Sequence, residues 1–349
     1  MCKQRMCSRI SQASARLFGL ALLVAASLAC VTLSACAHTS DLSSEQISVY
    51  SREDGSGTRG AFAELLGLET EMNGKTVDTI TPRAVVTNST AVMMTSVASD
   101  PAAIGYISYG SLNDMVKALE IDGVSPTSES IKDKSYPIFR AFSLVTNEPV
   151  DPAADSDGEG GSHPTTAADA PDAADTSEPA DDKRALIQDF MRFVASQQGQ
   201  GIIEENRFVG SVEDPQTYTH ARNQAKPAGK LVIAGSSSVA GVMEKLAEAY
   251  EQENPDVSLE IQQSDSTTGI AMVEAGTCDI GMTSRNLTET ETASGMFATP
   301  LAFDGIAVIV SPTFPLDGLT SQEVRDIFSA ETTTFSELPS WSQAETKED

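Results

Sequence analysis

Residues 47–60 have the sequence ISVYSREDGSGTRG, and residues 231–239, far along the chain, have the sequence LVIAGSSSV. Each stretch begins with apolar, strand-forming residues and continues into the glycine and hydroxyl residues typical of a helix start. A helix N-terminus presents unpaired N–H groups and the positive end of the helix dipole, so it favours an anion. Two such helix ends that face each other can enclose a small oxyanion without a metal.

Both loops carry side chains that suit an oxyanion. Glycines permit close approach of the backbone, hydroxyl groups donate hydrogen bonds, and a guanidinium matches two oxygens of one anion. Two more segments have the same hydroxyl-rich character, residues 264–269 (SDSTTG) and 278–285 (CDIGMTSR). The first two loops supply these candidate ligands for an anion: Arg52, Ser56, Gly57, Thr58, Ser236, Ser237 and Ser238.

Strand and helix signals alternate along residues 47–147 and again after residue 185. Such alternation predicts an α/β fold with sheets covered by helices. In such sheets ligands bind at the carboxyl ends of the strands, where these loops would lie.

Net charge and residue composition exclude several classes of partner and activity. The formal net charge of −27 argues against partners such as nucleic acid or anionic lipid. It does not exclude a small anion, because distant charges are screened over about 8–10 Å. We find no Ser/His/Asp or Cys/His arrangement for catalysis and no metal-ligand spacing, so we expect no reaction, no metal and no cofactor. Cys278 is interpreted as a small buried residue.

The N-terminus resembles a targeting segment. An apolar run, Leu17–Leu33, follows the basic residues Lys3, Arg5, Arg9 and Arg16. Leu33-Ser34-Ala35-Cys36 resembles the bacterial lipobox, which predicts a signal peptide over residues 1–36 and lipidation of Cys36. A plain secretory signal and a transmembrane anchor are the alternatives. The predicted location is the extracytoplasmic face of the membrane, with residues 37–46 as a tether.

Two other segments interrupt the folded pattern. Residues 148–183 are rich in Ala, Asp, Pro, Ser and Thr, and we predict a disordered acidic insertion. Residues 211–229 are predicted to be a polar connector.

The stretch Gly55–Gly60 also satisfies the pattern GxGxxG, with Asp78 about 20 residues further on. This favours a second hypothesis, a dinucleotide-dependent enzyme. It leaves the hydroxyl-rich loop at residues 235–238 unexplained, and an exported chain is not expected to meet nicotinamide cofactors.

Together, residues 52–59, 235–239, 263–269 and 279–281 resemble the phosphate-binding component of ABC phosphate importers. Members of that family normally begin with the Gly-Ser-Ser-Ser loop and reach the Asp-Gly-Ser-Gly-Thr loop later. Here the order is reversed, so we interpret the chain as a circular permutant in which residues 211–229 join the former ends. Two truncated units that each pair with another chain are the alternative.

The resemblance implies a two-lobed type II periplasmic-binding-protein fold with the ligand in the interlobe cleft. One lobe would comprise residues 47–138 plus 306–340 and the other residues 139–305. Strands near 136–145 and 303–310 would form the hinge. The implied function is capture of inorganic phosphate by a monomer that delivers it to ABC permease subunits. One alternative is another oxyanion ligand, sulfate or molybdate. The other is a phosphate-sensing or adhesive role without a permease.

Carried over by position, the family's contacts fall on Arg52, Ser56, Gly57, Thr58, Ser237, Ser238 and Ser266. Ser284 stands where well-studied members have an aspartate that accepts the proton of phosphate, and Thr267 and Arg285 complete the predicted set. The substitute proton acceptors that we consider are Asp54, Asp265 and Asp304. A charged acceptor would favour protonated phosphate and repel ionised sulfate.

Overall fold

The computed structural model describes residues 42–72, 75–151, 179–219 and 226–348. Its contacts divide the chain into residues 1–42 and a compact unit of residues 43–349, and the description below concerns the second unit. The signal segment and Cys36 lie outside the described residues.

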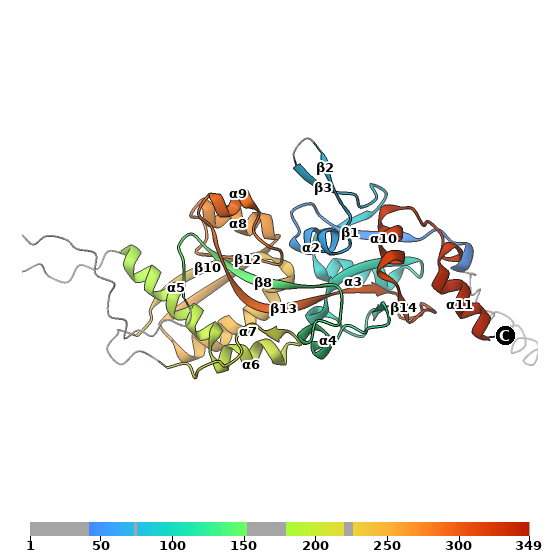
Figure 1. Ribbon diagram of the computed structural model, residues 1–349. Helices are drawn as coiled ribbons and strands as arrows, with labels where there is room; N and C mark the ends of the chain where they lie inside the picture. Colours follow the sequence, from blue (N-terminus) through green and yellow to red (C-terminus); the bar gives the residue numbers. More distant parts are fainter. Residues whose placement is uncertain (1–41, 73–74, 152–178, 220–225, 349) are drawn as a thin grey trace, which may run out of the picture. The chain divides into compact units, whose positions relative to one another are not determined.

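The described residues contain one large mixed sheet (Figure 1). Its strands, in spatial order, are β11 (Val257–Ser264), β10 (Gly229–Ser236), β12 (Ile280–Thr283), β8 (Phe139–Thr146), β13 (Phe297–Val310), β5 (Ala103–Ser108), β1 (Ser48–Arg52) and β4 (Val85–Thr87), with β6 (Lys117–Ala118) and β9 (Val209–Gly210) also paired to β13. Two small sheets pair β2 (Glu69–Met72) with β3 (Lys75–Asp78) and β7 (Glu120–Ile121) with β14 (Gly318–Leu319). Because β10 is parallel to both β11 and β12, the loops after these three strands share one edge of the sheet.

Helices occupy the connections between these strands. They are α2 (Gly57–Leu65), α3 (Thr90–Ser99), α4 (Ser128–Lys132), α5 (Pro179–Ala195), α6 (Gln197–Glu205), α7 (Ser237–Glu253), α8 (Ser266–Glu274), α9 (Glu289–Ala293), α10 (Ser321–Ser329) and α11 (Pro339–Glu348), with 3₁₀ turns η1 (Leu42–Ser44), η2 (Tyr109–Ser111) and η3 (Phe335–Glu337). The predicted α/β class is therefore confirmed.

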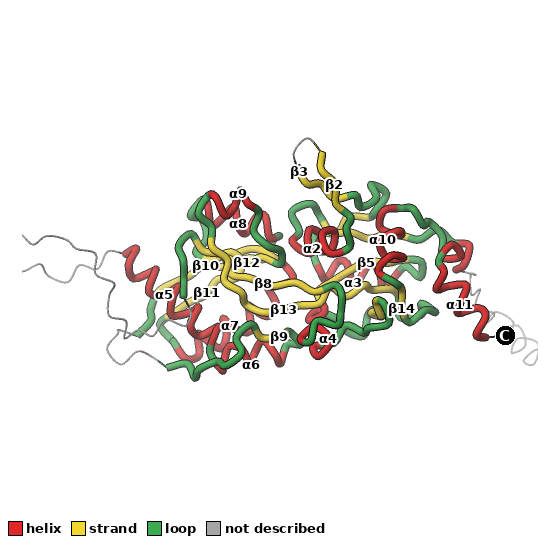
Figure 2. Tube along the Cα trace, in the orientation of Figure 1, coloured by secondary structure: helices red, strands yellow, loops and turns green. Residues whose placement is uncertain are grey.

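Strand β13 belongs to two hydrophobic cores. Its early residues Leu301 and Ala302 pack with the apolar faces of α5, α6 and α7, whereas Ala307 and Ile309 pack with α3 and β5. The strand pairs with β8 along Phe297–Gly305 and with β5 from residue 306 onward. Figure 2 shows β8 and β13 running side by side between the two groups of elements. This is the geometry of a chain crossing between two lobes.

Residues 179–183 of the predicted disordered insertion, residues 148–183, are helical. Residues 152–178 lie outside the described part, but α5 begins at Pro179 rather than at residue 185. Proline suits the first turn of a helix, because its missing N–H would have no partner there and its fixed φ is helical.

Parts of the expected tether and connector, and residues beyond the expected lobe end at 340, pack against the rest of the fold. Gln46 forms a β-bridge with the segment before η3, and Trp341, beyond the expected end of the lobe, stacks on Phe335. In the connector, whose residues 220–225 are not described, buried Tyr218 donates a hydrogen bond of 2.6 Å to Asp189. A single buried aromatic side chain thus anchors this segment, and its otherwise polar composition gives no sign of that contact.

Candidate functional site

The first predicted loop joins β1 to α2 with only four residues between them. Arg52 ends the strand, and Ser56 is the N-cap of the helix, where its hydroxyl accepts a hydrogen bond from the Arg59 N–H at 3.4 Å. Gly57 and Thr58 are the first two helical residues, and both are buried. Their amides belong to the first turn, whose N–H groups lack partners within the helix.

The second predicted loop is shorter, because Ser236 both ends β10 and is the N-cap of α7. Its hydroxyl makes no capping bond and instead donates to Ser284 Oγ at 2.9 Å. Gly235 before it has φ +136°, and a Cβ there would lie 2.3 Å from the Met282 carbonyl oxygen, so only glycine fits. The amides that begin α7 are therefore without a Ser236 cap and can serve an anion.

The third predicted segment joins β11 to α8. Asp265 is the N-cap of α8 and accepts hydrogen bonds from the Thr268 N–H at 2.9 Å and the Thr268 hydroxyl at 2.6 Å. Ser266 is fully buried, and its Oγ accepts a bond from the Ser284 N–H at 3.1 Å. The Thr267 N–H donates to the Gly55 carbonyl at 3.2 Å, which connects this loop with the first one.

These segments converge although they are far apart in sequence. Thr58 Oγ1 lies 2.9 Å from Ser238 Oγ, and Arg52 Nη2 donates to Ser237 Oγ at 3.1 Å. A Cβ on Gly57 would lie 2.3 Å from Ser266 Oγ and 2.7 Å from Ser284 Oγ. We call the hydroxyl groups of Thr58, Ser236, Ser238, Ser266 and Ser284 the hydroxyl cluster. Four buried serines and a buried threonine gathered at three helix N-termini form a set of donors for a small anion.

Arg52 lies beside this cluster and is 2% exposed. Its Nε and Nη2 donate to the two carboxylate oxygens of Glu53 at 2.8 and 2.7 Å. This bidentate pair fixes the plane of the guanidinium. Glu53 was not among the predicted site residues, because a charged residue next to Arg52 gives no separate signal in the sequence.

Two predicted ligands are engaged elsewhere. The Arg285 guanidinium forms a bidentate pair with Glu291 at 2.7 and 2.8 Å and donates to Thr267 Oγ1 at 3.1 Å. The structure thus brings these two side chains to each other rather than to the hydroxyl cluster.

The three candidate proton acceptors occupy different environments. The Asp54 side chain is 97% exposed and lies 3.3 Å from Arg59, and Asp265 is occupied in capping α8. Asp304 on β13 is fully buried, and its Oδ1 accepts a hydrogen bond from Ser108 Oγ at 2.9 Å. Its Oδ2 lies 3.3 Å from Arg140 Nη2. Burial raises the pKa of Asp304 to about 6, against the opposing effects of Arg140 and Ser108.

Arg140 and Thr90 are further residues near the site that the sequence analysis missed. Arg140 on β8 donates from Nη1 to the Ser284 carbonyl at 3.1 Å, and a lone arginine in an apolar strand was a usable signal. Thr90 begins α3, and its Oγ1 lies 3.5 Å from Ser238 Oγ. The sequence Ser89-Thr90 before an apolar helix has the hydroxyl-rich character of the other helix starts.

The alternative dinucleotide site lacks its expected geometry. Asp78 ends β3, which pairs antiparallel with β2 in a separate hairpin instead of lying parallel to β1. Its carboxylate receives two hydrogen bonds from Arg59, at 2.8 and 3.0 Å. A ribose-binding acid would need to lie at the end of a neighbouring parallel strand.

Among the described residues, no group of three or more His, Cys, Asp or Glu side chains could hold a metal ion. The helices in this part of the chain are also too short or too polar to cross a membrane. Cys278 is buried and free, as expected, and burial raises the pKa of its thiol to about 11.

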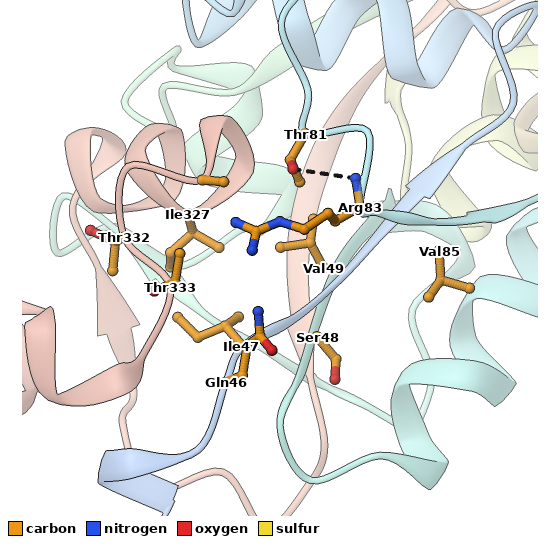
Figure 3. Close-up of a pocket in the computed structure, with 11 residues that line it drawn as sticks. Gln46, Ile47, Ser48, Val49, Thr81, Arg83, Val85, Ile327, Thr332 and Thr333 are labelled. Atoms are coloured by element: carbon orange, nitrogen blue, oxygen red, sulfur yellow. Dashed lines mark hydrogen bonds between the residues drawn. The ribbon is translucent and has the colours of Figure 1, made fainter.

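A separate cavity of about 330 Å³ lies near the amino ends of β1 and β4 (Figure 3). Ser48 and Val85 line it, and Arg83 reaches into it. Arg52 and Thr87 end these same strands, so the cavity is at the opposite edge from the hydroxyl cluster. It contains none of the predicted anion ligands.

The chain is similar to known proteins along most of its length. A family described as PBP superfamily domain matches residues 37–198 and 220–348. The chain is 42% identical over 309 residues to Phosphate-binding protein PstS 2 of Streptococcus agalactiae, covering 88% of this chain and 92% of the relative. It is 36% identical over 320 residues to the Streptococcus pneumoniae serotype 4 protein of the same name, covering 90% and 97%. A crystal structure of a phosphate-binding protein of a phosphate ABC transporter from S. pneumoniae TIGR4 superposes with a TM-score of 0.60 at 36% identity, covering 84% of this chain and all of that one.

Proposed function

Because the chain belongs to the PBP superfamily and, within it, to the PstS phosphate-binding proteins, we propose that it captures inorganic phosphate outside the cytoplasm and delivers it to an ABC permease. The observation that carries this proposal is the hydroxyl cluster beside Arg52. It offers an oxyanion neutral donors from several helix starts and one guanidinium. Like its relatives, the chain is a binding protein and not an enzyme.

The anion would be held by Arg52, Ser56, Gly57 and Thr58 from one lobe and by Ser236, Ser237, Ser238, Ser266 and Ser284 from the other. The proposed lobes are residues 47–138 plus 306–340 and residues 139–305. The change of partner along β13, from β8 to β5 at residue 306, supports this division. Strands β8 and β13 would flex when the lobes close on the anion. We propose that the binding protein acts as a monomer.

We also propose the circular permutation. A permuted chain is cut at a surface point, so its new ends should meet, and the Ile47 N–H donates to the Thr333 carbonyl at 2.9 Å. The connector at residues 211–229 would join the former ends. The streptococcal relatives align over 92% and 97% of their own lengths, which supports the same segment order in them.

Sulfate is the second candidate ligand, for a specific reason. In the described part of the chain, no carboxylate is hydrogen-bonded to the hydroxyl cluster. The family resemblance places Ser284 at the position where well-studied members have an aspartate. Hydroxyl groups both donate and accept, so they can bind an ionised anion as well as a protonated one. Of the three proposed proton acceptors, Asp304 is the one whose pKa is raised by burial. It pairs with Arg140, which in turn donates to the Ser284 carbonyl, so Arg140 lies between Asp304 and the hydroxyl cluster.

A titration tests the function directly. Protein freed of carried-over ligand should bind phosphate with a dissociation constant of about 1 µM or below, measured by calorimetry. Sulfate, molybdate and NAD are titrated in parallel. Tighter binding of sulfate or molybdate would reassign the ligand within the oxyanions. NAD binding without phosphate binding would favour the enzyme hypothesis. Phosphate binding in an organism without a neighbouring permease would point to a sensor.

We propose that Cys36 anchors the protein through lipid after removal of residues 1–35, on the basis of the lipobox-like sequence. Mass spectrometry of the membrane fraction should find an N-terminal peptide that begins at lipid-modified Cys36. Recovery of the mature protein in the medium with an unmodified N-terminus beyond this cysteine would contradict the proposal. One lipid group alone gives only weak attachment, so two or more chains on the cysteine are expected.

A further inference from the structure

A buried ion pair links the two strands that cross between the cores. Arg140 on β8 and Asp304 on β13 are register partners, and their side chains are 4% and 0% exposed. Asp304 divides its bonding among Arg140, Ser108 Oγ and the Gly110 N–H. The remaining contacts of the guanidinium lead toward the predicted anion site.

The positive charge of Arg140 is only partly offset by the groups around it. Its distance to Asp304 is 3.3 Å, which is long for a charge-assisted bond, and its Nε is buried without a hydrogen-bond partner. Arg140 also donates to the Ser284 carbonyl at 3.1 Å, and its guanidinium carbon lies 5.1 Å from the centre of the Phe142 ring. Buried charges are normally paired and fully hydrogen-bonded, so this cation would be stabilised by further negative charge nearby.

The hydroxyl cluster is the place where such charge would enter. Arg140 donates a hydrogen bond to the carbonyl of Ser284. Ser284 in turn accepts a hydrogen bond at Oγ from Ser236 and donates one from its N–H to Ser266 Oγ. Arg140 therefore fixes the peptide that carries the central hydroxyl of the cluster.

We infer that Arg140 is a positioning residue for the anion, which holds Ser284 in place and supplies a second buried positive charge behind the hydroxyl cluster. Asp304 orients this guanidinium and offsets part of its charge. The inference rests on the proposed oxyanion function and extends it, since neither residue touches the anion.

The electrostatics agree with this geometry. Burial lowers the pKa of Arg140 to about 10, and repulsion from Arg52 adds to that effect against the attraction of Asp304. Arg140 therefore remains charged at neutral pH. An anion near both guanidinium groups would relieve the repulsion between them. In the part of the chain that the structure describes, Tyr136 is a further titratable group close to Asp304. Its pKa is raised by burial and, to a smaller extent, by the charge of Asp304.

The experiment measures phosphate affinity of the full chain by calorimetry at pH 7.5. Arg140→Gln, which removes the charge at similar length, should weaken binding by about tenfold or more, and Arg140→Lys should recover part of that loss. Asp189→Asn is the control, because it alters another buried carboxylate, bonded to Tyr218 and Tyr250, away from the cluster. Its affinity should stay within about twofold of wild type even if the protein is less stable.

If Arg140→Gln does not fold, Asp304→Asn tests the role of Arg140 instead. It keeps Arg140 and an amide oxygen that can still accept the orienting hydrogen bond, and it removes the compensating charge. Phosphate should therefore bind about threefold or more tightly at pH 7.5. The ratio of its affinity to that of wild type should approach one as the pH falls below about 6, because Asp304 is then protonated in the wild type. The phosphate ionisation is common to both proteins and cancels in the ratio.

The outcomes separate the two proposals. If the wild type does not bind phosphate or another oxyanion, the proposed function fails. If the wild type binds and folded Arg140→Gln binds within about twofold of it, or Asp304→Asn binds equally or more weakly, the role of Arg140 is overturned.

Discussion

An Arg52→Ala variant is expected to bind phosphate about 100-fold more weakly than the wild-type protein, which corresponds to about 3 kcal/mol. Arg52 is 2% exposed and lies within hydrogen-bond distance of Ser237 Oγ, so its charge acts on an anion with little screening. The variant also leaves the Glu53 carboxylate without its bidentate partner beside the site. The loss therefore combines a missing attraction with a new repulsion.

A second substitution separates these two contributions. The double variant Arg52→Ala/Glu53→Gln should recover about tenfold of the affinity, because the unpaired negative charge is gone. Arg83→Ala is the matched control, since Arg83 is an exposed arginine at the opposite edge of the same strands. It should bind phosphate within about twofold of wild type. Calorimetry on variants with unchanged thermal unfolding gives the comparison, and equal affinities of Arg52→Ala and wild type would refute the placement of the anion.

The features of the site that are local in sequence could be predicted. A strand that ends in glycine and hydroxyl residues and leads into a helix is set by a few consecutive positions. The starts of α2, α7 and α8 therefore lie within the predicted stretches 47–60, 231–239 and 264–269. Their convergence was expected from the resemblance and from the rule that ligands bind at the carboxyl ends of strands.

The remainder depends on pairings that no local pattern specifies. Arg140 and Asp304 are 164 positions apart, and only the register of β8 against β13 makes them partners. The neighbouring strands β6 and β7 are likewise separated at Leu119, because β6 pairs with β13 and β7 pairs with β14. Which of several carboxylates meets which arginine is decided by such register and not by composition.

A Gly57→Ala variant is expected to lose about 10–100-fold in phosphate affinity through steric conflict alone. The added methyl group would lie 2.3 Å from Ser266 Oγ and 2.7 Å from Ser284 Oγ. Ser266 cannot simply rotate away, because it is fully buried and its Oγ accepts the Ser284 N–H. Overpacking of this kind typically costs about 1–3 kcal/mol, and separation of the two lobes would relieve it. The cost should therefore appear in the closed, anion-bound form.

Gly241→Ala is the matched control for this prediction. Gly241 is an exposed position within α7, and a Cβ there would meet no atom within 4 Å. Its affinity should not change, and the free energy of unfolding should rise by about 0.5–1 kcal/mol, because alanine is the better helix former. If Gly57→Ala bound phosphate as tightly as Gly241→Ala, the proposed closure of the two lobes over Gly57 would be wrong. The anion would then have to lie away from the start of α2, since any anion bound at that helix end must share the space that the methyl group takes.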